Sequence, residues 1–144
     1  ADAVDAGREV LEAGGNAVDA AIAVAFALHV AEPFASGIGG GGFMLVLPAG
    51  GEPQFLDYRE IAPAAARRDM FVDATADQIN FSGKSVAVPG HLRGMQLAHR
   101  LYGSRPMAEL LAPAIRLAAE GVTASAAMAS ASALCSGNSI NPGR

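Results

Sequence analysis

The stretch Gly37-Ile38-Gly39-Gly40-Gly41-Gly42-Phe43-Met44-Leu45-Val46-Leu47, together with Asp57-Tyr58-Arg59-Glu60 further along, decides the predicted fold. Glycine lets a backbone turn tightly and take positive φ angles that side chains would forbid, at an entropic cost in the unfolded chain. So dense a run of glycines indicates either a functional site or an unusually crowded crossing of the chain.

The apolar run 43–47 after the glycines is typical of a β-strand. Residues 48–53 contain two prolines and two glycines and predict a turn, so residues 54–60 would return as a second, paired strand. Apolar side chains alternate onto both faces of the first strand, which is the pattern of a strand covered on both sides. We therefore expect a β-hairpin that forms an inner layer, with helices over at least one face.

Two helices are predicted before the hairpin. Residues 1–13 have the pattern of a weakly amphipathic helix that ends at Gly14 and Gly15. Asn16 is placed to cap a second helix over residues 17–30, with Asp19 three residues on as the partner in a capping box. Because that second helix is apolar all round, we expect it to be buried.

Two more helices are predicted after the hairpin, beyond a polar loop over residues 73–84. The first runs from His91 to about Leu101, and the second runs from Pro106 through Ala118 with Pro113 as a boundary or kink. The expected inner face of the first of these consists of Met95, Leu97, Ala98 and Leu101. Residues 126–144 are predicted to be an irregular tail.

Composition excludes several classes of function. The 144 residues suffice for a single domain, and a formal charge of −4 with scattered Lys and Arg gives no basis for binding nucleic acid. The longest apolar helix is too short to cross a bilayer, and no export signal is predicted at the N-terminus. The hydrophobic fraction of 51% is high for a domain of this size. Part of its surface is therefore expected to pack against other sequence.

Motif searches predict no cofactor, no metal and no nucleophile. The glycines at 37, 39 and 42 match a dinucleotide-binding fingerprint, but a helix precedes them and a strand follows, which is the reverse of the required order. His29, His91 and His99 lack metal-ligand spacing and are interpreted as structural. Cys135 has no activating neighbour in the sequence.

Arg59 is the polar residue that the pattern singles out. It lies late in the second predicted strand, on the same face as Asp57 and close to the glycine-rich crossing. A guanidinium grips a carboxylate through two parallel hydrogen bonds, which suits it to hold an amino-acid or peptide carboxylate. The alternative is a structural ion pair with Asp57 or Glu60, and spacing alone favours that alternative.

Several long motifs, in order, resemble the N-terminal region of the large chain of γ-glutamyltranspeptidase, the glutathione hydrolase family. The resemblance extends from residue 1 to about residue 125. The motifs are Gly14-Gly15-Asn16-Ala17-Val18-Asp19-Ala20-Ala21, Glu32-Pro33, Ser36 to Met44, Asp57-Tyr58-Arg59-Glu60, Ala62-Pro63-Ala64-Ala65, Val88-Pro89-Gly90, Tyr102-Gly103 and Leu110 to Ala118 with Gly121.

The resemblance implies a mixed α/β (α+β) chain that forms part of an N-terminal-nucleophile hydrolase, a four-layer αββα sandwich. It implies cleavage of the γ-glutamyl bond of glutathione and related compounds through a γ-glutamyl-enzyme, followed by transfer to water or to an amino acid or peptide. In that family the nucleophile is a threonine at the start of a separate small chain, with its own α-amino group as base. The arginine of the Asp-Tyr-Arg-Glu motif grips the substrate α-carboxylate, a role that falls on Arg59.

Residues 1–125 are accordingly expected to be the N-terminal portion of the large chain, with the small chain as partner. Thr75 and Thr123 stand in the wrong context to be the nucleophile, so the chain alone is expected to be inactive. Resemblance to bacterial members implies a periplasmic or secreted location. Two alternatives remain open: a cephalosporin or glutaryl acylase of the same fold, and a truncated, non-catalytic binding module.

Overall fold

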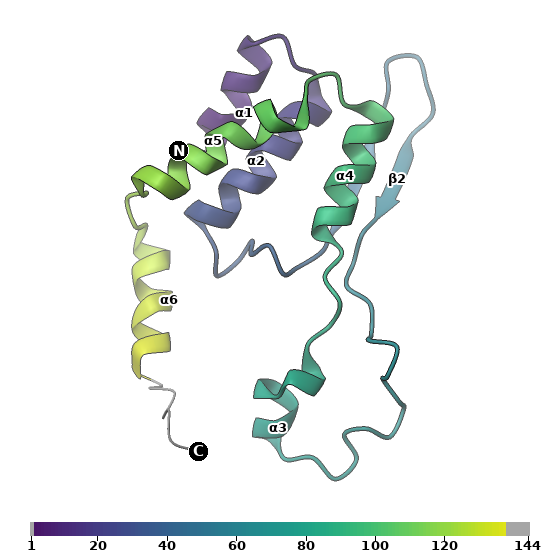
Figure 1. Ribbon diagram of the computed structural model, residues 1–144, viewed down its shortest axis with the longest axis vertical. Coiled ribbons are helices and arrows are strands. Elements are labelled where there is room, and N and C mark those ends of the chain that lie inside the picture. Colours follow the sequence, from purple (N-terminus) through teal and green to yellow (C-terminus); the bar gives the residue numbers. More distant parts are fainter. Residues whose placement is uncertain (1, 138–144) are drawn as a thin grey trace. The chain divides into compact units, whose positions relative to one another are not determined.

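The computed structural model describes residues 2–137, and Figure 1 shows their helices and strands along the chain. Contacts between Cα atoms divide the chain into two compact units. Residues 38–97 form one unit, and the described residues before and after them form the other. The single domain suggested by chain length is thus organised as two units, because length limits the number of domains but does not fix how contacts are distributed.

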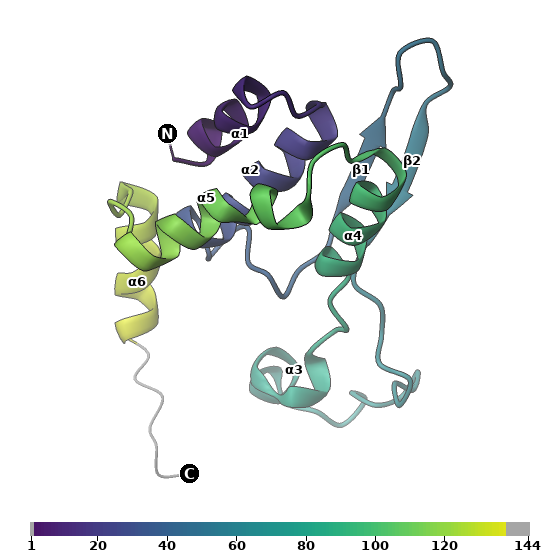
Figure 2. The same ribbon diagram turned by 45° about the horizontal axis from the view of Figure 1, so that its top comes forward.

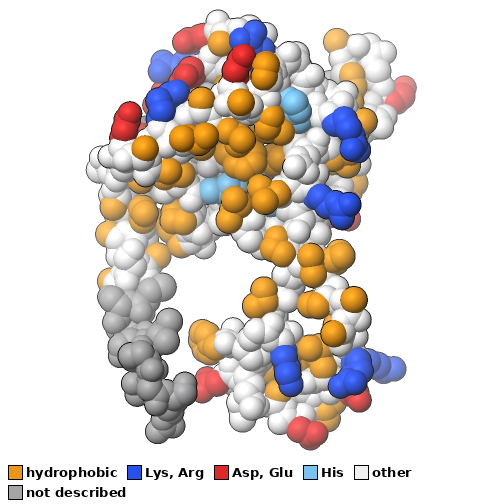
Figure 3. Space-filling model, viewed as in Figure 1, with side chains coloured by type: hydrophobic (Ala, Val, Ile, Leu, Met, Phe, Trp, Pro, Cys, Tyr) orange, Lys and Arg blue, Asp and Glu red, His pale blue; other side chains and the backbone are white. Residues whose placement is uncertain are grey.

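The first unit is helical. One cluster of its core consists of small side chains, with Ala3, Ala6 and Ala27 buried against one another and flanked by Val24 and Leu117, and the larger Ile22 and Leu110 are also fully buried. Small side chains allow helix axes to approach closely, which explains how an alanine-rich sequence forms a core. Figure 3 shows hydrophobic side chains over α2 and α5 and charged ones over α1. The helices are α1 (Asp2–Glu12), α2 (Ala17–Ala31), α5 (Met107–Glu120) and α6 (Ala126–Gly137).

The predicted ends of the first two helices are confirmed. Gly14 has a φ of 86°, and the Gly15 backbone N–H donates to the Val10 carbonyl over 2.9 Å, so the two glycines close α1. Asn16 caps α2 in a complete capping box with Asp19. Burial of α2 is less complete than predicted: Ile22 and Ala27 are buried, whereas residues 28–31 near its C-terminal end are only partly covered.

The second unit contains the predicted hairpin. Strands β1 (Phe43–Val46) and β2 (Gln54–Asp57) pair antiparallel, with Phe43 opposite Asp57. Between the strands, the Gly51 N–H donates to the Pro48 carbonyl over 3.0 Å, and Gly50 has a φ of 71°. This is the geometry of a type II turn, which needs glycine at its third position.

Only one face of the hairpin is covered, so the predicted inner layer is wrong for the described chain. Leu56 is buried, while Leu45 on the opposite face is 71% exposed and Phe55 is 62% exposed. Figure 2 shows α4 (His91–Tyr102) beside the hairpin. The alternation of apolar residues correctly predicted that both faces of the hairpin are apolar, but the described residues bury only one of these faces.

Three local predictions differ from the structure. The predicted polar loop contains α3 (Ala76–Phe81) and a 3₁₀ turn over Gly83–Ser85, because Thr75 and Gln78 form a capping box. The buried stripe of α4 consists of residues 91, 94, 95 and 98, whereas Leu101 continues the same helical spacing near the end of the helix but is exposed. The predicted irregular tail is helical over α6, where alanine favours helix, and residues 138–144 lie outside the described part.

Pro113 lies inside α5, which continues past it to Glu120 and closes at Gly121 with a φ of 86°. The predicted boundary at Pro113 is therefore absent. Among residues 2–137, no helix is long and apolar enough to reach across a bilayer.

Candidate functional site

The segment that carries Arg59 continues directly from β2. The Tyr58 N–H donates to the Gly42 carbonyl over 3.0 Å, and the Gly42 N–H donates back to the Tyr58 carbonyl over 3.3 Å. Further on, Ile61 and Val88 form a two-way backbone bridge with donor–acceptor distances of 3.2 and 2.8 Å. Arg59 thus lies between two backbone pairings that fix the chain on either side of it.

The glycine tract is needed for space and not for unusual backbone angles. Positive φ angles occur among the described glycines only at Gly14, Gly50 and Gly121, all of which lie outside the tract. A Cβ added to Gly41 would lie 2.5 Å from the Tyr58 carbonyl oxygen and 2.9 Å from the Arg59 Cα. Distances this short are not found for real Cβ atoms. The crowded crossing predicted from the glycines is therefore confirmed.

The Arg59 side chain is 55% exposed and lies on the uncovered face of the hairpin. Its Nη1 is 3.3 Å from Glu60 Oε2, and its Cζ is 5.9 Å from the centre of the Phe43 ring. The Arg59 backbone N–H donates to Asp57 Oδ1 over 3.0 Å. The ion pair considered as the alternative is therefore formed with Glu60, while Asp57 contacts the backbone of Arg59 instead.

Each of these contacts is modest in strength. An exposed ion pair contributes about 0–1 kcal/mol, and an exposed cation–π contact about 0.5–1 kcal/mol. The guanidinium has five N–H donors, more than the pair with Glu60 can use. The arrangement can therefore orient the side chain and still accept an incoming carboxylate on the exposed side.

Phe43 is the contact that the sequence interpretation missed. Its ring stacks on that of Phe55 with a centroid separation of 5.5 Å and an interplanar angle of 22°. Because Phe43 and Phe55 are on the face shared by Arg59, the hairpin register contains the signal for this contact. Once the register was predicted, that shared face could have been used to find it.

Tyr58 points to the covered side of the hairpin. Its ring meets that of His91 edge-on at 6.0 Å, and its hydroxyl donates to the Phe43 carbonyl over 3.2 Å. Burial raises the pKa of the Tyr58 hydroxyl above its usual value. The hydroxyl therefore remains a hydrogen-bond donor at neutral pH.

A second polar cluster lies in the helical unit, around Asp19. This carboxylate has no exposed surface and accepts hydrogen bonds from the backbone of Asn16 (2.9 Å) and Ser104 (3.0 Å), and from the Ser104 hydroxyl (2.5 Å). Burial acts to raise the pKa of Asp19, but the hydrogen bonds outweigh it and hold the pKa below the usual value. Every donor here is protein, so we interpret the cluster as structural.

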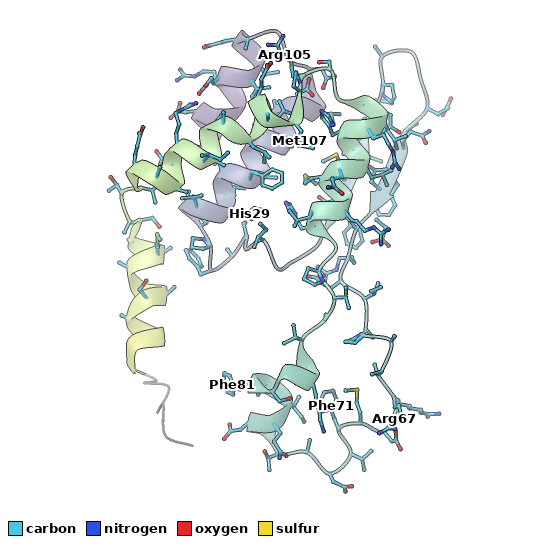
Figure 4. The ribbon with its side chains drawn as sticks, in the orientation of Figure 1. His29, Arg67, Phe71, Phe81, Arg105 and Met107 are labelled. Atoms are coloured by element: carbon cyan, nitrogen blue, oxygen red, sulfur yellow. The ribbon has the colours of Figure 1, made fainter. Side chains whose placement is uncertain are left out.

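His29 and His99 contact backbone carbonyls, while His91 packs edge-on against the Tyr58 ring. His29 Nδ1 bonds to the Ser36 carbonyl, and His99 Nε2 bonds to the Arg105 carbonyl over 2.7 Å. Figure 4 shows His29 near the end of α2 and Arg105 just before α5. Within residues 2–137, no group of three or more His, Cys, Asp or Glu side chains is placed to hold a metal ion.

Thr75 caps α3 by accepting a hydrogen bond from the Gln78 N–H over 3.3 Å, which is a structural role. The segment around it forms a depression of about 650 Å³, and Figure 4 labels Arg67, Phe71 and Phe81 in this part of the chain. The depression is lined by Asp69, Met70, Phe71, Asp73, Ala74, Gln78, Ser82, Gly83 and Lys84, without Arg59. The side chain of Cys135 lies outside the described part.

Solved structures define the class of fold. The chain is similar to the γ-glutamyltranspeptidase of Helicobacter pylori, with a TM-score of 0.86 and 40% identity over 90% of this chain and 38% of that one. It is also similar to a cephalosporin acylase from Bacillus halodurans, with a TM-score of 0.81 and 38% identity over 89% of this chain and 24% of that one. The chain is thus a mixed α/β part of an N-terminal-nucleophile hydrolase fold, as the resemblance implied.

Sequence comparison identifies the family within that class. The sequence pattern described as Gamma-glutamyltranspeptidase matches residues 3–140. The Glutathione hydrolase proenzyme of Bacillus subtilis (strain 168) is 45% identical over 135 residues, which is 90% of this chain and 23% of the relative. The chain belongs to the γ-glutamyltranspeptidase family and spans about a quarter of that relative's length.

Proposed function

We propose that this chain is part of the large chain of a γ-glutamyltranspeptidase that acts on glutathione and related γ-glutamyl compounds. In this proposal Arg59 binds the α-carboxylate of the γ-glutamyl group. The observation that carries the proposal is the half-exposed Arg59 guanidinium, held on a strand end that backbone pairing fixes on both sides. Family membership supplies the substrate class.

The chain contributes binding, and the bond-breaking group comes from elsewhere in the enzyme. The proposed nucleophile is the N-terminal threonine of a small chain, released by self-cleavage, with its own α-amino group as base. Its hydroxyl attacks the γ-carbonyl, and the amine leaves. The resulting γ-glutamyl ester is then resolved by water or by the amino group of an acceptor. By binding the α-carboxylate, Arg59 keeps the γ-carbonyl at the other end of the γ-glutamyl group next to the threonine hydroxyl.

A periplasmic or secreted location is proposed from the bacterial relatives named glutathione hydrolase proenzymes, including that of Pseudomonas aeruginosa. Cell fractionation with an antibody against this chain tests the location. Recovery in the periplasm or medium supports it, and recovery with cytoplasmic markers contradicts it.

A cephalosporin or glutaryl acylase is the second candidate, favoured by the similarity to the Bacillus halodurans acylase. Glutaryl groups lack the α-amino group of γ-glutamyl groups but keep the carboxylate at the same end. An arginine that binds this carboxylate would suit either acyl group. The complete Asp57-Tyr58-Arg59-Glu60 sequence favours the γ-glutamyl substrate because it is the full motif on which the resemblance to γ-glutamyltranspeptidase rests.

The test compares two anilides in a complete enzyme that contains this chain. One is a γ-glutamyl anilide, and the other is the 4-aminobutyryl anilide, which differs only in lacking the α-carboxylate. Their ratio of kcat/KM, the carboxylate preference, should fall roughly 30- to 1,000-fold in Arg59→Ala, because a charge-assisted pair of about 2–4 kcal/mol is lost. Arg8→Ala, on the exposed side of α1, is the control and should keep the ratio.

An unchanged carboxylate preference in a folded Arg59→Ala variant would contradict the proposal. Faster cleavage of a glutaryl anilide than of the γ-glutamyl anilide would instead favour the acylase. An intact-mass spectrum of the isolated protein distinguishes the two enzyme candidates, the γ-glutamyltranspeptidase and the acylase, from the truncated, non-catalytic binding module. A second chain that begins with threonine supports an enzyme, and a single species of 14.5 kDa supports the module.

A further inference from the structure

Two glycines of the α4 region approach the segment next to Arg59 even more closely than the glycine tract does. A Cβ added to Gly90 would lie 2.1 Å from the Tyr58 carbonyl oxygen and 2.7 Å from that of Arg59. A Cβ added to Gly94 would lie 2.2 Å from Tyr58 Cγ and 2.5 Å from Tyr58 Cβ. Neither glycine has a positive φ, so space alone requires glycine here.

The start of α4 is also tied to the glycine tract by hydrogen bonds. The backbone N–H groups of Gly90 and His91 both donate to the Gly40 carbonyl, over 3.2 and 3.0 Å. The adjacent Gly41 approaches the Tyr58 carbonyl from the tract side. The backbone of Tyr58 is therefore enclosed by glycines from two segments that are themselves bonded together.

This enclosure has a direct consequence for Arg59, the next residue in the chain. The Tyr58 carbonyl cannot move outward on either side without opening a hydrogen bond or a packed contact. An ordinary side chain at Gly41 or Gly90 would push the peptide between Tyr58 and Arg59 out of place, and one at Gly94 would displace the base of the Tyr58 side chain. In either case the Arg59 guanidinium would move.

We infer that Gly41, Gly42, Gly90 and Gly94 are positioning residues that set where Arg59 presents its guanidinium, and so determine the preference for substrates with an α-carboxylate. The inference rests on the proposed function of Arg59. The glycines act through Tyr58 and not by contact with substrate. Gly41 and Gly90 leave room for the Tyr58 carbonyl, and Gly42 and Gly94 leave room for the Tyr58 side chain.

A purely structural role would lower stability and the amount of active enzyme, and it would leave the carboxylate preference of the folded fraction unchanged. A positioning role changes that preference itself, mainly through KM for the γ-glutamyl anilide. The carboxylate preference is independent of enzyme concentration, so partial misfolding does not affect it. It therefore separates the two roles.

The experiment measures the carboxylate preference of Gly94→Ala and Gly42→Ala in the complete enzyme, beside Arg59→Ala. Gly42→Ala is the milder variant, since its Cβ would lie 3.1 Å from Cε2 of the same Tyr58 ring, farther than the 2.2 Å at Gly94. Gly39→Ala is the matched control from the same tract, because a Cβ there meets nothing within 4 Å. Melting temperatures report folding, and if Gly94→Ala does not fold, Gly42→Ala decides.

We expect the carboxylate preference to fall roughly 10- to 100-fold in Gly94→Ala, the scale of a misplacement of about 1 Å, and less in Gly42→Ala. Gly39→Ala should match the unaltered enzyme. Folded glycine variants that keep the full preference, while Arg59→Ala loses it, would overturn the inference and leave the proposed function intact. An unchanged preference in Arg59→Ala would overturn the proposed function and this inference with it.

Discussion

The two units of the chain achieve close packing in different ways. In the helical unit, small side chains such as Ala6 and Ala27 meet each other, and a buried carboxylate, Asp19, ties the loop before α5 to the start of α2. In the hairpin unit, close contact involves backbone, where Gly41 and Gly90 approach the Tyr58 carbonyl and Gly94 approaches the base of the Tyr58 side chain. The comparison shows that glycine and alanine, both small, have different uses here.

The difference determines what each unit tolerates. A side-chain core can repack when a methyl group is added, because neighbouring side chains rotate. A backbone crossing cannot repack without moving the chain. The unit that holds Arg59 is therefore the less adaptable of the two, which suits a site whose geometry must be constant.

Removing the Asp19 carboxylate should have the largest effect on the helical unit. Asp19→Ala removes a buried carboxylate that accepts hydrogen bonds from the backbone N–H groups of Asn16 and Ser104 and from the Ser104 hydroxyl, and we expect a loss of about 3–4 kcal/mol in the free energy of unfolding. Denaturant unfolding of the complete protein measures it. Asp5→Ala, which removes an exposed α1 carboxylate paired with Arg8 at 2.9 Å, is the control. A loss no larger than that of the control would refute the role of Asp19.

Replacing one glycine by alanine in each unit should show how differently the two units tolerate an added methyl group. Glycine to alanine inside a helix normally stabilises by about 0.5–1 kcal/mol. Gly94→Ala should instead destabilise by about 1–3 kcal/mol, since the new Cβ meets the base of the Tyr58 side chain.

Gly7→Ala in α1 is the matched substitution in the helical unit. Its Cβ would lie 2.6 Å from Val24 Cγ2, the end of a side chain that can rotate. We expect a cost well below that of Gly94→Ala, measured by the same denaturant unfolding. Equal costs for the two variants would mean that the backbone crossing is no less adaptable than the side-chain core.

Acid should reduce the contribution of Asp19 without removing the residue. Its pKa is lowered in the folded state, so its stabilisation is complete above the unfolded value of about 3.9 and is lost as the pH falls through the lower folded pKa. The stability difference between the unaltered protein and Asp19→Asn should therefore be constant from pH 7 to about pH 5 and shrink below about pH 4. A difference that stays constant down to pH 2 would contradict the lowered pKa.

Local signals predicted much of the fold. The Asn16–Asp19 capping box, the closing glycines of α1 and the hairpin turn all depend on residues within a few positions of each other. The helix α3 was missed although Thr75 and Gln78 carried its capping signal, because the segment is polar and only six residues long.

What the sequence could not provide depends on distant contacts. Ser104 is 85 positions from Asp19, and no local pattern connects the two. No local pattern connects Gly90 or Gly94 with Tyr58, although both lie against it in the structure. Arg59 was identified from the sequence, but the glycine contacts that hold the neighbouring Tyr58 in place were not, because predicting them requires knowing which segments cross.

The most direct test of the central claim is a crystal structure of the complete enzyme with glutamate bound. If Arg59 binds the α-carboxylate, its guanidinium nitrogens should lie about 2.7–2.9 Å from the two carboxylate oxygens, with the Tyr58 backbone still enclosed by the glycines. A glutamate whose α-carboxylate is held by other groups, with Arg59 paired only to Glu60, would contradict the account.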